Sequence, residues 1–447
     1  MSTSTPVINI VEVIDREPIR AFQIRVFILC GLVQLLDGFD AQAIAFVAQA
    51  VSRQFGLSIA SFGSIFGAGT LGMTLGALIL PPLADRFGRR RLTIICTFIF
   101  AVFSLATAWA DTFTSLLVLR LLAGFGLGAA TPCLIPLVSE YSPKRRRAIA
   151  VSMVTACWPL GAVIGGALSA NIIPIWGWQS VFYIGGILPL LLVLILMWGL
   201  PESIRFMAGQ GQSPERIAKT LRQISPGLAY SPGTQFLLPE EKLSGVPAKH
   251  LFTGGRAPAT VLLWIVFFIN FIFLFFMFNW LPAVIQQAGQ PLSTAILATV
   301  GFNLGGVVGG IIMGRLMDRY GQYPVLGVAY ALAAIFVGSI AFVGGSVPYI
   351  MAAVVLAGFC SLGAQVCGNA LAASLYPTMT RSTGVGWAYG IGRIGSIVGP
   401  VAGGVLLGLG WGVGPLFLVA SLLLVGATVA LILLWRVALH AESGAPS

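Results

Sequence analysis

The chain has 447 residues, of which 57% are hydrophobic and only 9% are charged, and its mean hydropathy is +0.95. A soluble domain carries about 25% charged residues, so this composition excludes an ordinary soluble protein and indicates one that lies in a lipid bilayer. The net charge of +11 is not gathered on a basic soluble domain, which argues against a nucleic-acid-binding protein.

Apolar segments long enough to cross a bilayer recur along the chain. A helix needs about 20 apolar residues to span the hydrocarbon, whereas a barrel strand needs only about 10. The predicted spans are 22–50, 60–83, 92–110, 114–139, 148–172, 179–200, 258–287, 294–317, 324–343, 347–375, 382–407 and 412–435. The N-terminus has no signal-peptide pattern, because acidic and polar residues interrupt it. The sequence therefore predicts an all-α membrane protein with twelve transmembrane helices.

Basic residues are distributed unevenly between the two sets of loops. Almost all of the 25 Lys and Arg lie at the termini or in alternate loops, and the other loops hold only Arg53. By the positive-inside rule, both termini and the basic loops are expected to be cytoplasmic. We thus predict a multi-pass protein of the cell (inner) membrane.

Few residues are available for metal or nucleophilic chemistry. The six cysteines lie within predicted spans without the paired spacing of a zinc site. His250 and His440 both lie outside the spans. We expect no metal and no cofactor, and an enzyme is disfavoured because no nucleophile–base constellation is present in the spans.

The chain divides into two similar halves. The only long hydrophilic segment is predicted to be a cytoplasmic linker with one or two short helices, at residues 201–257. It separates an N-terminal six-helix bundle (1–200) from a C-terminal one (258–447).

A motif near the second span is repeated near the eighth. "GALILPPLADRFGRRR" and "GGIIMGRLMDRYGQYP" share their spacing of glycine, aspartate and arginine. The first contains Gly76, Asp85, Arg86 and Gly88, and the second contains Gly309, Asp318, Arg319 and Gly321. Two parallel six-helix repeats place a substrate site at their interface near the bilayer midplane.

These motifs resemble those of the major facilitator superfamily over essentially the whole chain. The loop "DRFGRRR" matches the superfamily signature, and Arg120 in "LRLLAGFGLGAATP" resembles its span-four motif. Within the superfamily, "DGFDAQAIAFVA" in span one and "PESIRF" after span six are similar to the aromatic acid:proton symporters. The resemblance implies a transporter with two pseudo-symmetric six-helix bundles.

Charged residues inside the spans are the main functional candidates. Asp37 and Asp40 lie three residues apart on one face of span one, close to the midplane. Two carboxylates in a low-dielectric site do not both ionise readily, so one is expected to carry a proton, which is the coupling ion. Arg393 offers a planar fork for a substrate carboxylate, and Arg120 is either a second such group or a partner of the aspartates. The alternative is a static ion pair that holds the helices together.

Other in-span side chains are candidates for lining a substrate cavity. Amides and aromatic rings suit a hydroxylated benzoate-like ring, although helix packing and lipid contact explain many such residues equally well. The candidates are Gln34, Asn270, Asn279, Asn303, Gln365, Asn369, Trp387 and Tyr389, with Trp158 as a further aromatic residue.

The resemblance also implies a gating network in the basic loops. Its candidate members are Asp85, Arg86, Gly88, Arg89, Arg90, Glu140, Asp318 and Arg319. Asp85 can accept hydrogen bonds at the end of a neighbouring helix, and the arginines can pair with Glu140. Simple determination of topology by basic residues is the alternative.

The leading hypothesis is proton-coupled import of a monocyclic aromatic carboxylate, such as a hydroxybenzoate, by a monomer in the lipid bilayer. A sugar, polyol or other organic-anion carrier of the same superfamily is an alternative, since "PES" and "SEYSPKRR" also resemble sugar carriers. A non-transporting ligand sensor would need an effector domain, for which the linker and tails look too short.

Overall fold

The computed structural model describes residues 7–210, 214–227, 234–237, 251–253, 256–342, 346–376 and 380–443. The side chains of Asp85 and Arg381 are among those outside the described part. His250, predicted to lie outside the spans, is also outside the described residues, and so is the side chain of His440.

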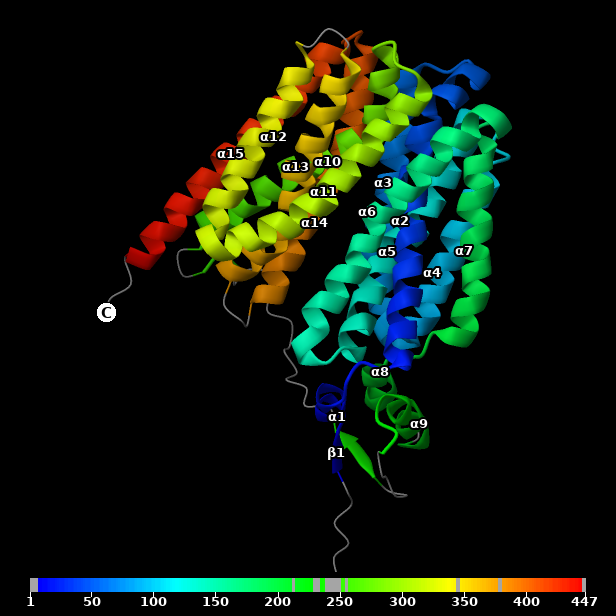
Figure 1. The fold of residues 1–447 in the computed structure, drawn as a ribbon, viewed down its shortest axis with the longest axis vertical. Coiled ribbons are helices and arrows are strands. Elements are labelled where there is room, and N and C mark those ends of the chain that lie inside the picture. Colours follow the sequence, from blue (N-terminus) through cyan, green and yellow to red (C-terminus); the bar gives the residue numbers. More distant parts are fainter. Residues whose placement is uncertain are drawn as a thin grey trace, which may run out of the picture.

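Twelve helices in the described residues are long and apolar enough to cross a membrane. The N-terminal bundle consists of α2 (Ala21–Phe55), α3 (Phe62–Phe87), α4 (Arg89–Thr107), α5 (Phe113–Tyr141), α6 (Lys144–Trp176) and α7 (Gln179–Gly199). The C-terminal bundle consists of α10 (Ala257–Gln287), α11 (Leu292–Tyr320), α12 (Gln322–Ile340), α13 (Val347–Leu375), α14 (Arg381–Gly408) and α15 (Val413–Ser443). Each predicted span corresponds to one of these helices, so the predicted all-α membrane fold is confirmed (Figure 1).

Short elements gather at one end of the molecule, which we call the linker face. They are β1 (Val7–Asn9), α1 (Ile10–Arg16), α8 (Ile204–Gly209), α9 (Pro214–Ile224) and β2 (Gln235–Leu237). A further turn, η1 (Ile59–Ser61), lies at the opposite end, between α2 and α3. The strands β1 and β2 pair in parallel, and neither strand was predicted from the sequence. Figure 1 shows α1, α8 and α9 below the N-terminal bundle.

The N-terminal segment is bound to the linker face by side chains. The Ser225 hydroxyl donates to Glu17 Oε1 at 2.8 Å, and Arg20 forms an ion pair with Glu17 at 3.1 Å. These contacts lower the pKa of the half-buried Glu17 carboxyl below its usual value. The backbone N–H of Lys144 donates to Asp15 Oδ1 at 2.7 Å. The segment that precedes α2 thus connects the linker to the start of α6.

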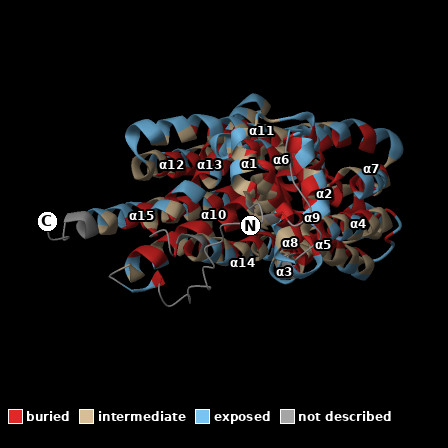
Figure 2. Ribbon diagram, turned by 90° about the horizontal axis from the view of Figure 1, so that it is seen from below, coloured by how far each residue is buried: buried red, intermediate tan, exposed pale blue. Residues whose placement is uncertain are grey.

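The two bundles repeat the same internal packing. In the first, α2 packs on α6 and α3 packs on α5, and in the second α10 packs on α14 and α11 on α13. Seen from the linker face in Figure 2, exposed residues lie mostly on the outer surfaces of both bundles, as expected for helices that contact lipid.

A glycine occupies the equivalent sharp turn between two helices in each repeat. Gly88 separates α3 from α4 with φ of 100°, and Gly321 separates α11 from α12 with φ of 85°. Positive φ is unfavourable for residues with a Cβ atom, so these sharp turns explain why both copies of the motif carry glycine. A Cβ atom at Gly88 would also collide with the carboxylate of Glu202.

The bundles contact each other mainly in the half of the molecule away from the linker face. There α6 packs on α11 and α3 packs on α14. Gly63 approaches Gly404, and the rings of Phe66 and Trp280 lie 5.1 Å apart in an edge-to-face arrangement. On the linker side the bundles diverge (Figure 1), and Met153 on α6 is 68% exposed there.

Candidate functional site

The two aspartates of α2 lie inside the protein near the middle of the helix. Asp37 and Asp40 are each 1% exposed, so neither faces lipid. They belong to a helix that packs against α6 in its own bundle and against α10 in the other. The polar face predicted for the first span therefore points into the protein, where buried carboxylates require partners.

Asp40 forms a buried ion pair with Arg120 of α5. The Arg120 Nη1 atom lies 3.4 Å from Asp40 Oδ2, and the two side chains are 4% and 0% exposed. The hydroxyl of Ser104 donates to Asp40 Oδ1. Arg120 also donates to the Thr107 hydroxyl at 2.6 Å, and its guanidinium lies 4.9 Å from the centre of the Phe182 ring. A buried pair persists only when such contacts offset its desolvation, and here only Arg120 Nε lacks a hydrogen bond.

Asp37 has fewer contacts and lies where the bundles meet. The indole Nε1 of Trp158 donates to Asp37 Oδ1 at 3.1 Å. Asp37 and Arg393 of α14 attract each other electrostatically, although no direct ion pair joins these two described residues. Asp37 thus belongs to the N-terminal bundle, and Arg393, a cation that attracts its carboxylate, belongs to the C-terminal bundle.

A cluster of polar residues in the C-terminal bundle includes Tyr389, which interacts electrostatically with Arg393. The Asn270 amide donates to Gln365 Oε1 at 2.5 Å, which links α10 to α13. Asn270 Oδ1 and Gln365 Nε2 are buried without a hydrogen-bond partner. The Tyr389 hydroxyl faces Gln365 and Asn369 and also interacts with Arg393. The structure thus brings together five of the residues proposed from the sequence and leaves one buried acceptor and one buried donor unpaired.

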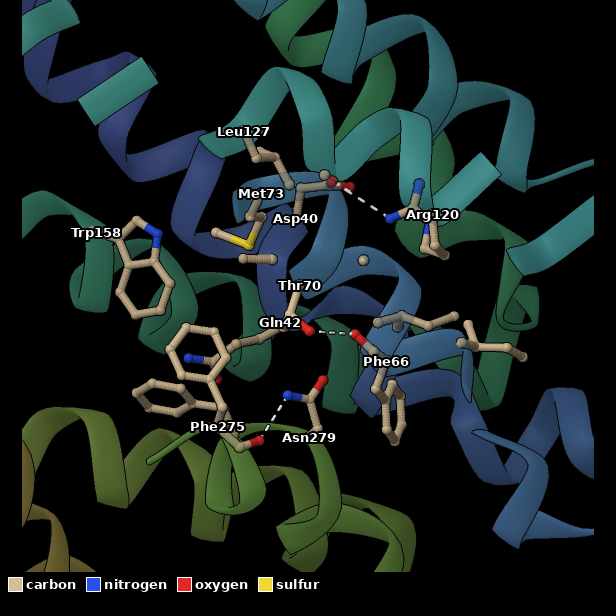
Figure 3. Close-up of a pocket in the computed structure, with 16 residues that line it drawn as sticks. Asp40, Gln42, Phe66, Thr70, Met73, Arg120, Leu127, Trp158, Phe275 and Asn279 are labelled. Atoms are coloured by element: carbon tan, nitrogen blue, oxygen red, sulfur yellow. Dashed lines mark hydrogen bonds and ion pairs between the residues drawn. The ribbon is translucent and has the colours of Figure 1, made fainter. Parts of the chain in front are cut away.

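A cavity lies between the bundles next to the Asp40–Arg120 pair (Figure 3). Its volume is about 40 Å³, which is room for a few water molecules. Its lining includes Asp40, Gln42, Phe66, Thr70, Arg120, Trp158, Phe275, Phe278 and Asn279. In Figure 3 the ion pair lies on one side of the cavity and the rings of Trp158 and Phe275 lie on the other. The cavity therefore combines buried charge with aromatic surface.

Several predicted residues lie apart from this cavity and this cluster. Gln34 is buried and accepts a hydrogen bond from the Thr131 hydroxyl at 3.0 Å, within the N-terminal bundle. Trp387 is 45% exposed and stacks on Trp264 at 5.6 Å. The structure thus does not bring Trp387 together with Tyr389 and Arg393.

One predicted amide bridges the two bundles. Asn303 of α11 and Gln42 of α2 exchange two hydrogen bonds, at 3.1 and 3.2 Å. Asn303 also donates to the carbonyl of Thr299 at 2.9 Å. Each amide both donates to and accepts from the other, so this pair holds the bundles in register at the cavity's edge.

Sequence reasoning missed some residues of the site. Ser104 and Thr107 are ordinary small residues of an apolar helix, and nothing in the sequence marks them as partners of a buried ion pair. Gln42 follows Asp40 by two residues, and an amide within a span is a signal that could have included it. Trp158 was considered for its ring, whereas its contact with Asp37 is a hydrogen bond from its N–H.

The network predicted at the linker face is present in part. Arg89 forms an ion pair with Glu140, and the Ser203 hydroxyl donates to Glu140 at 2.5 Å. Arg90 instead donates to the Met197 carbonyl, and its backbone N–H donates to Glu202 at 3.1 Å.

Other members of that predicted network have different surroundings. The exposed Arg86 lies over the ring of Phe87. The side chain of Asp85 is outside the described residues.

The second bundle carries an uncharged version of the same contact. Gln322 and Ser374 occupy the places that correspond to Arg89 and Glu140, and the Gln322 amide donates to the Ser374 hydroxyl at 2.5 Å. Asp318 and Arg319 are both exposed, and Arg319 lies over the Tyr320 ring. At the linker face, the charge pair is thus found in one repeat and a neutral hydrogen bond in the other.

Comparisons with known proteins agree with this architecture. The Major Facilitator Superfamily model matches residues 30–298 and 263–447. The xylose transporter XylE from E. coli, in a partially occluded inward open conformation, has a similar fold, with a TM-score of 0.73 and 17% identity over 93% of this chain and 98% of that one.

Curated relatives are more similar in sequence. The 4-hydroxybenzoate transporter PcaK of Pseudomonas putida is 39% identical over 90% of each chain. The gallate transporter of the same species is 38% identical over 95% of this chain and 94% of its own length. The benzoate transport protein of Acinetobacter baylyi is 32% identical over 90% and 87%. This chain is therefore a multi-pass membrane transporter and not an enzyme, and it belongs to the aromatic acid transporters of the major facilitator superfamily.

Proposed function

We propose that the protein imports an aromatic carboxylate of the hydroxybenzoate type together with protons. The observation that carries this proposal is the position of Asp37. Its carboxylate accepts a hydrogen bond from Trp158 of its own bundle and interacts electrostatically with Arg393 of the other bundle and with the buried Asp40. The relatives are named for 4-hydroxybenzoate, gallate and benzoate, all of which are aromatic acids.

The proposed coupling follows from the charge balance at the junction of the bundles. A substrate carboxylate that binds Arg393 competes with Asp37 for the same cation, and protonation of Asp37 removes that competition. An anion that enters with a proton carries no net charge, so its movement avoids the cost of about 2.3 kcal/mol per charge per 100 mV. Asp40 and Arg120 line the cavity, and their opposite charges largely cancel each other.

We infer alternating access from the way the bundles meet. Their contacts lie away from the linker face, and the ribbons of the two bundles diverge towards it. If both termini are cytoplasmic, as the basic loops predict, this is an inward-facing arrangement in the inner membrane. Substrate can enter from the side away from the linker face only if the contacts between the bundles on that side separate. The hydrogen bonds between Gln42 and Asn303 are among those that must break. Each chain contains both bundles, which is consistent with a functional monomer.

A sugar or polyol carrier is the main alternative within the superfamily. The likeness to XylE is a likeness of fold alone at 17% identity. Two arginines near the junction, the buried Arg120 and the half-buried Arg393, favour an anionic substrate, because a neutral sugar needs no cation.

Uptake by energised membrane vesicles tests the proposal. Labelled 4-hydroxybenzoate, benzoate and xylose are supplied with and without a protonophore. We expect accumulation of the aromatic acids above the equilibrium level, lost when the protonophore is added, and no accumulation of xylose. Accumulation that the protonophore leaves unchanged would refute proton coupling, and xylose accumulation would favour the sugar carrier.

A further inference from the structure

A second cavity, far from the transport site, opens at the linker face. It lies between the turn that joins α3 to α4 and the short helices α8 and α9, and its volume is about 580 Å³. Its lining residues are Arg86, Phe87, Arg90, Arg91, Glu202, Phe206, Met207, Gln210, Arg216, Lys219 and Thr220. The volume falls in the range of roughly 300–1,000 Å³ that is typical of small-molecule sites.

The cavity is strongly basic, and the positive charge of its described lining residues exceeds their negative charge. Five of the lining side chains are cationic, and none of them forms an ion pair with a described carboxylate. Among the described lining residues, Glu202 is the acidic one. Its Oε1 atom already accepts the backbone N–H groups of Arg90 at 3.1 Å and Ser203 at 2.9 Å. The positive charge is therefore available to a ligand.

Arg90 is held in place with one donor unused. Its Nη2 atom donates to the carbonyl of Met197 at the end of α7. Its Nε atom is buried and has no hydrogen-bond partner. A buried N–H without a partner costs free energy, so this atom indicates where an acceptor group is missing.

The helix α9 presents basic residues to the cavity because its other face is buried. Ile217, Leu221 and Ile224 pack against the base of the N-terminal bundle. Arg216 and Lys219 lie on the exposed side and line the cavity. The amphipathic pattern of α9 thus fixes which of its residues face the ligand.

We propose that this cavity binds the phosphate group of an anionic molecule. Guanidinium groups match phosphate oxygens in charge and planar geometry, and basic pockets at the ends of transmembrane helices suit phospholipid head groups. The exposed Phe87 and the half-buried Phe206 add apolar surface beside the cations. The same chemistry accepts two sources of phosphate, an anionic phospholipid or a soluble phosphorylated metabolite.

Thermal unfolding of the purified full-length protein in neutral detergent tests the proposal. Tryptophan fluorescence gives the unfolding midpoint during titration with phosphatidylglycerol, phosphatidylcholine or sn-glycerol 3-phosphate. The test variant is Arg216→Gln/Lys219→Gln, which changes exposed side chains outside the bundles. The control variant is Arg145→Gln/Arg146→Gln, which removes two exposed cations of α6 on the same face but outside the cavity.

We expect phosphatidylglycerol or glycerol 3-phosphate to raise the midpoint of the unmodified protein. The test variant should bind about 30-fold more weakly and the control variant within about twofold of the original. A response to phosphatidylglycerol alone identifies a lipid site, and a response to glycerol 3-phosphate identifies the soluble source. The proposal is overturned if neither compound raises the midpoint, if the test variant binds as tightly as the original protein, or if both variants lose affinity equally.

Discussion

The polar centres of the two bundles differ in how completely their groups are paired. In the N-terminal bundle, Asp40 and Arg120 are bonded to each other and to neighbouring hydroxyl groups. In the C-terminal bundle, Asn270 and Gln365 retain an unpaired acceptor and an unpaired donor, and Arg393 has no direct ion pair with a described carboxylate.

This difference suggests a division of labour. Asp40 and Arg120, which are bonded to each other with only Arg120 Nε left unpaired, are held in one arrangement, whereas the unpaired groups of Asn270 and Gln365 gain free energy when a ligand completes their hydrogen bonds. We therefore propose that substrate recognition lies chiefly in the C-terminal bundle and that the Asp40–Arg120 pair provides structural support. Asp37 interacts with residues of both bundles, so we expect its protonation to depend on whether substrate is bound to the C-terminal bundle.

The largest effect is expected from Asp37→Asn. The amide cannot exchange a proton, so accumulation driven by a proton gradient should be abolished. Exchange of labelled for unlabelled substrate at equal concentrations should persist, because it requires no net proton movement. Vesicle uptake with an imposed pH gradient measures the first and counterflow measures the second. Undiminished accumulation would show that Asp37 is not the coupling group.

Asp40→Asn should differ from Asp37→Asn in stability. Removing the Asp40 charge leaves Arg120 buried without its counter-ion, which costs about 3–5 kcal/mol. Asp37 has no such direct pair, so its substitution should shift the thermal unfolding midpoint much less. The double variant Asp40→Asn/Arg120→Gln, which removes both charges, should recover part of the loss. Equal midpoints for the two single variants would contradict the contrast between the two aspartates.

The sequence was sufficient for the spans and for the inward direction of Asp37 and Asp40, because hydrophobic length and the cost of charge in lipid determine both. Partners were harder to predict. Ser104 is 64 residues from Asp40, and their contact depends on how α4 is rotated against α2.

The opposite placement of Trp387 and Tyr389 was available from helical periodicity. Tyr389 and Arg393 are four residues apart and share a face, whereas Trp387 is two residues from Tyr389 and lies on another face. Trp387 and Tyr389 were both predicted to lie near Arg393 because they are close to it in the sequence. Residues that are close in sequence can nevertheless lie on different faces of a helix.

Arg393→Ala should weaken binding of the substrate carboxylate selectively. A charge-assisted hydrogen bond contributes about 1.5–3 kcal/mol, so affinity for 4-hydroxybenzoate should fall roughly 10- to 150-fold. Affinity for its uncharged amide, 4-hydroxybenzamide, should change little. Arg393→Lys keeps the charge without the planar fork and should give an intermediate loss. Equal losses for the acid and the amide would identify Arg393 as a structural residue.

The smallest effect concerns the unpaired atoms of Asn270 and Gln365. Whichever way these two amides are oriented, the pair leaves one NH2 group and one carbonyl oxygen for a ligand, and a ring hydroxyl can accept from the first and donate to the second. Replacing both by Leu and Met should therefore reduce the preference for 4-hydroxybenzoate over benzoate by roughly 5- to 10-fold.

Competition binding with the two unlabelled acids measures that preference. Asn303→Leu is the matched control, because the Asn303 amide is already bonded to Gln42 and Thr299, and its loss should affect both acids alike. An unchanged preference in the Asn270/Gln365 variant would place the hydroxyl elsewhere, next to Asn279 and the aromatic rings of the cavity. In that case the N-terminal side of the junction would share in recognising the ring, and the division of labour between the bundles would be less complete than their hydrogen bonds suggest.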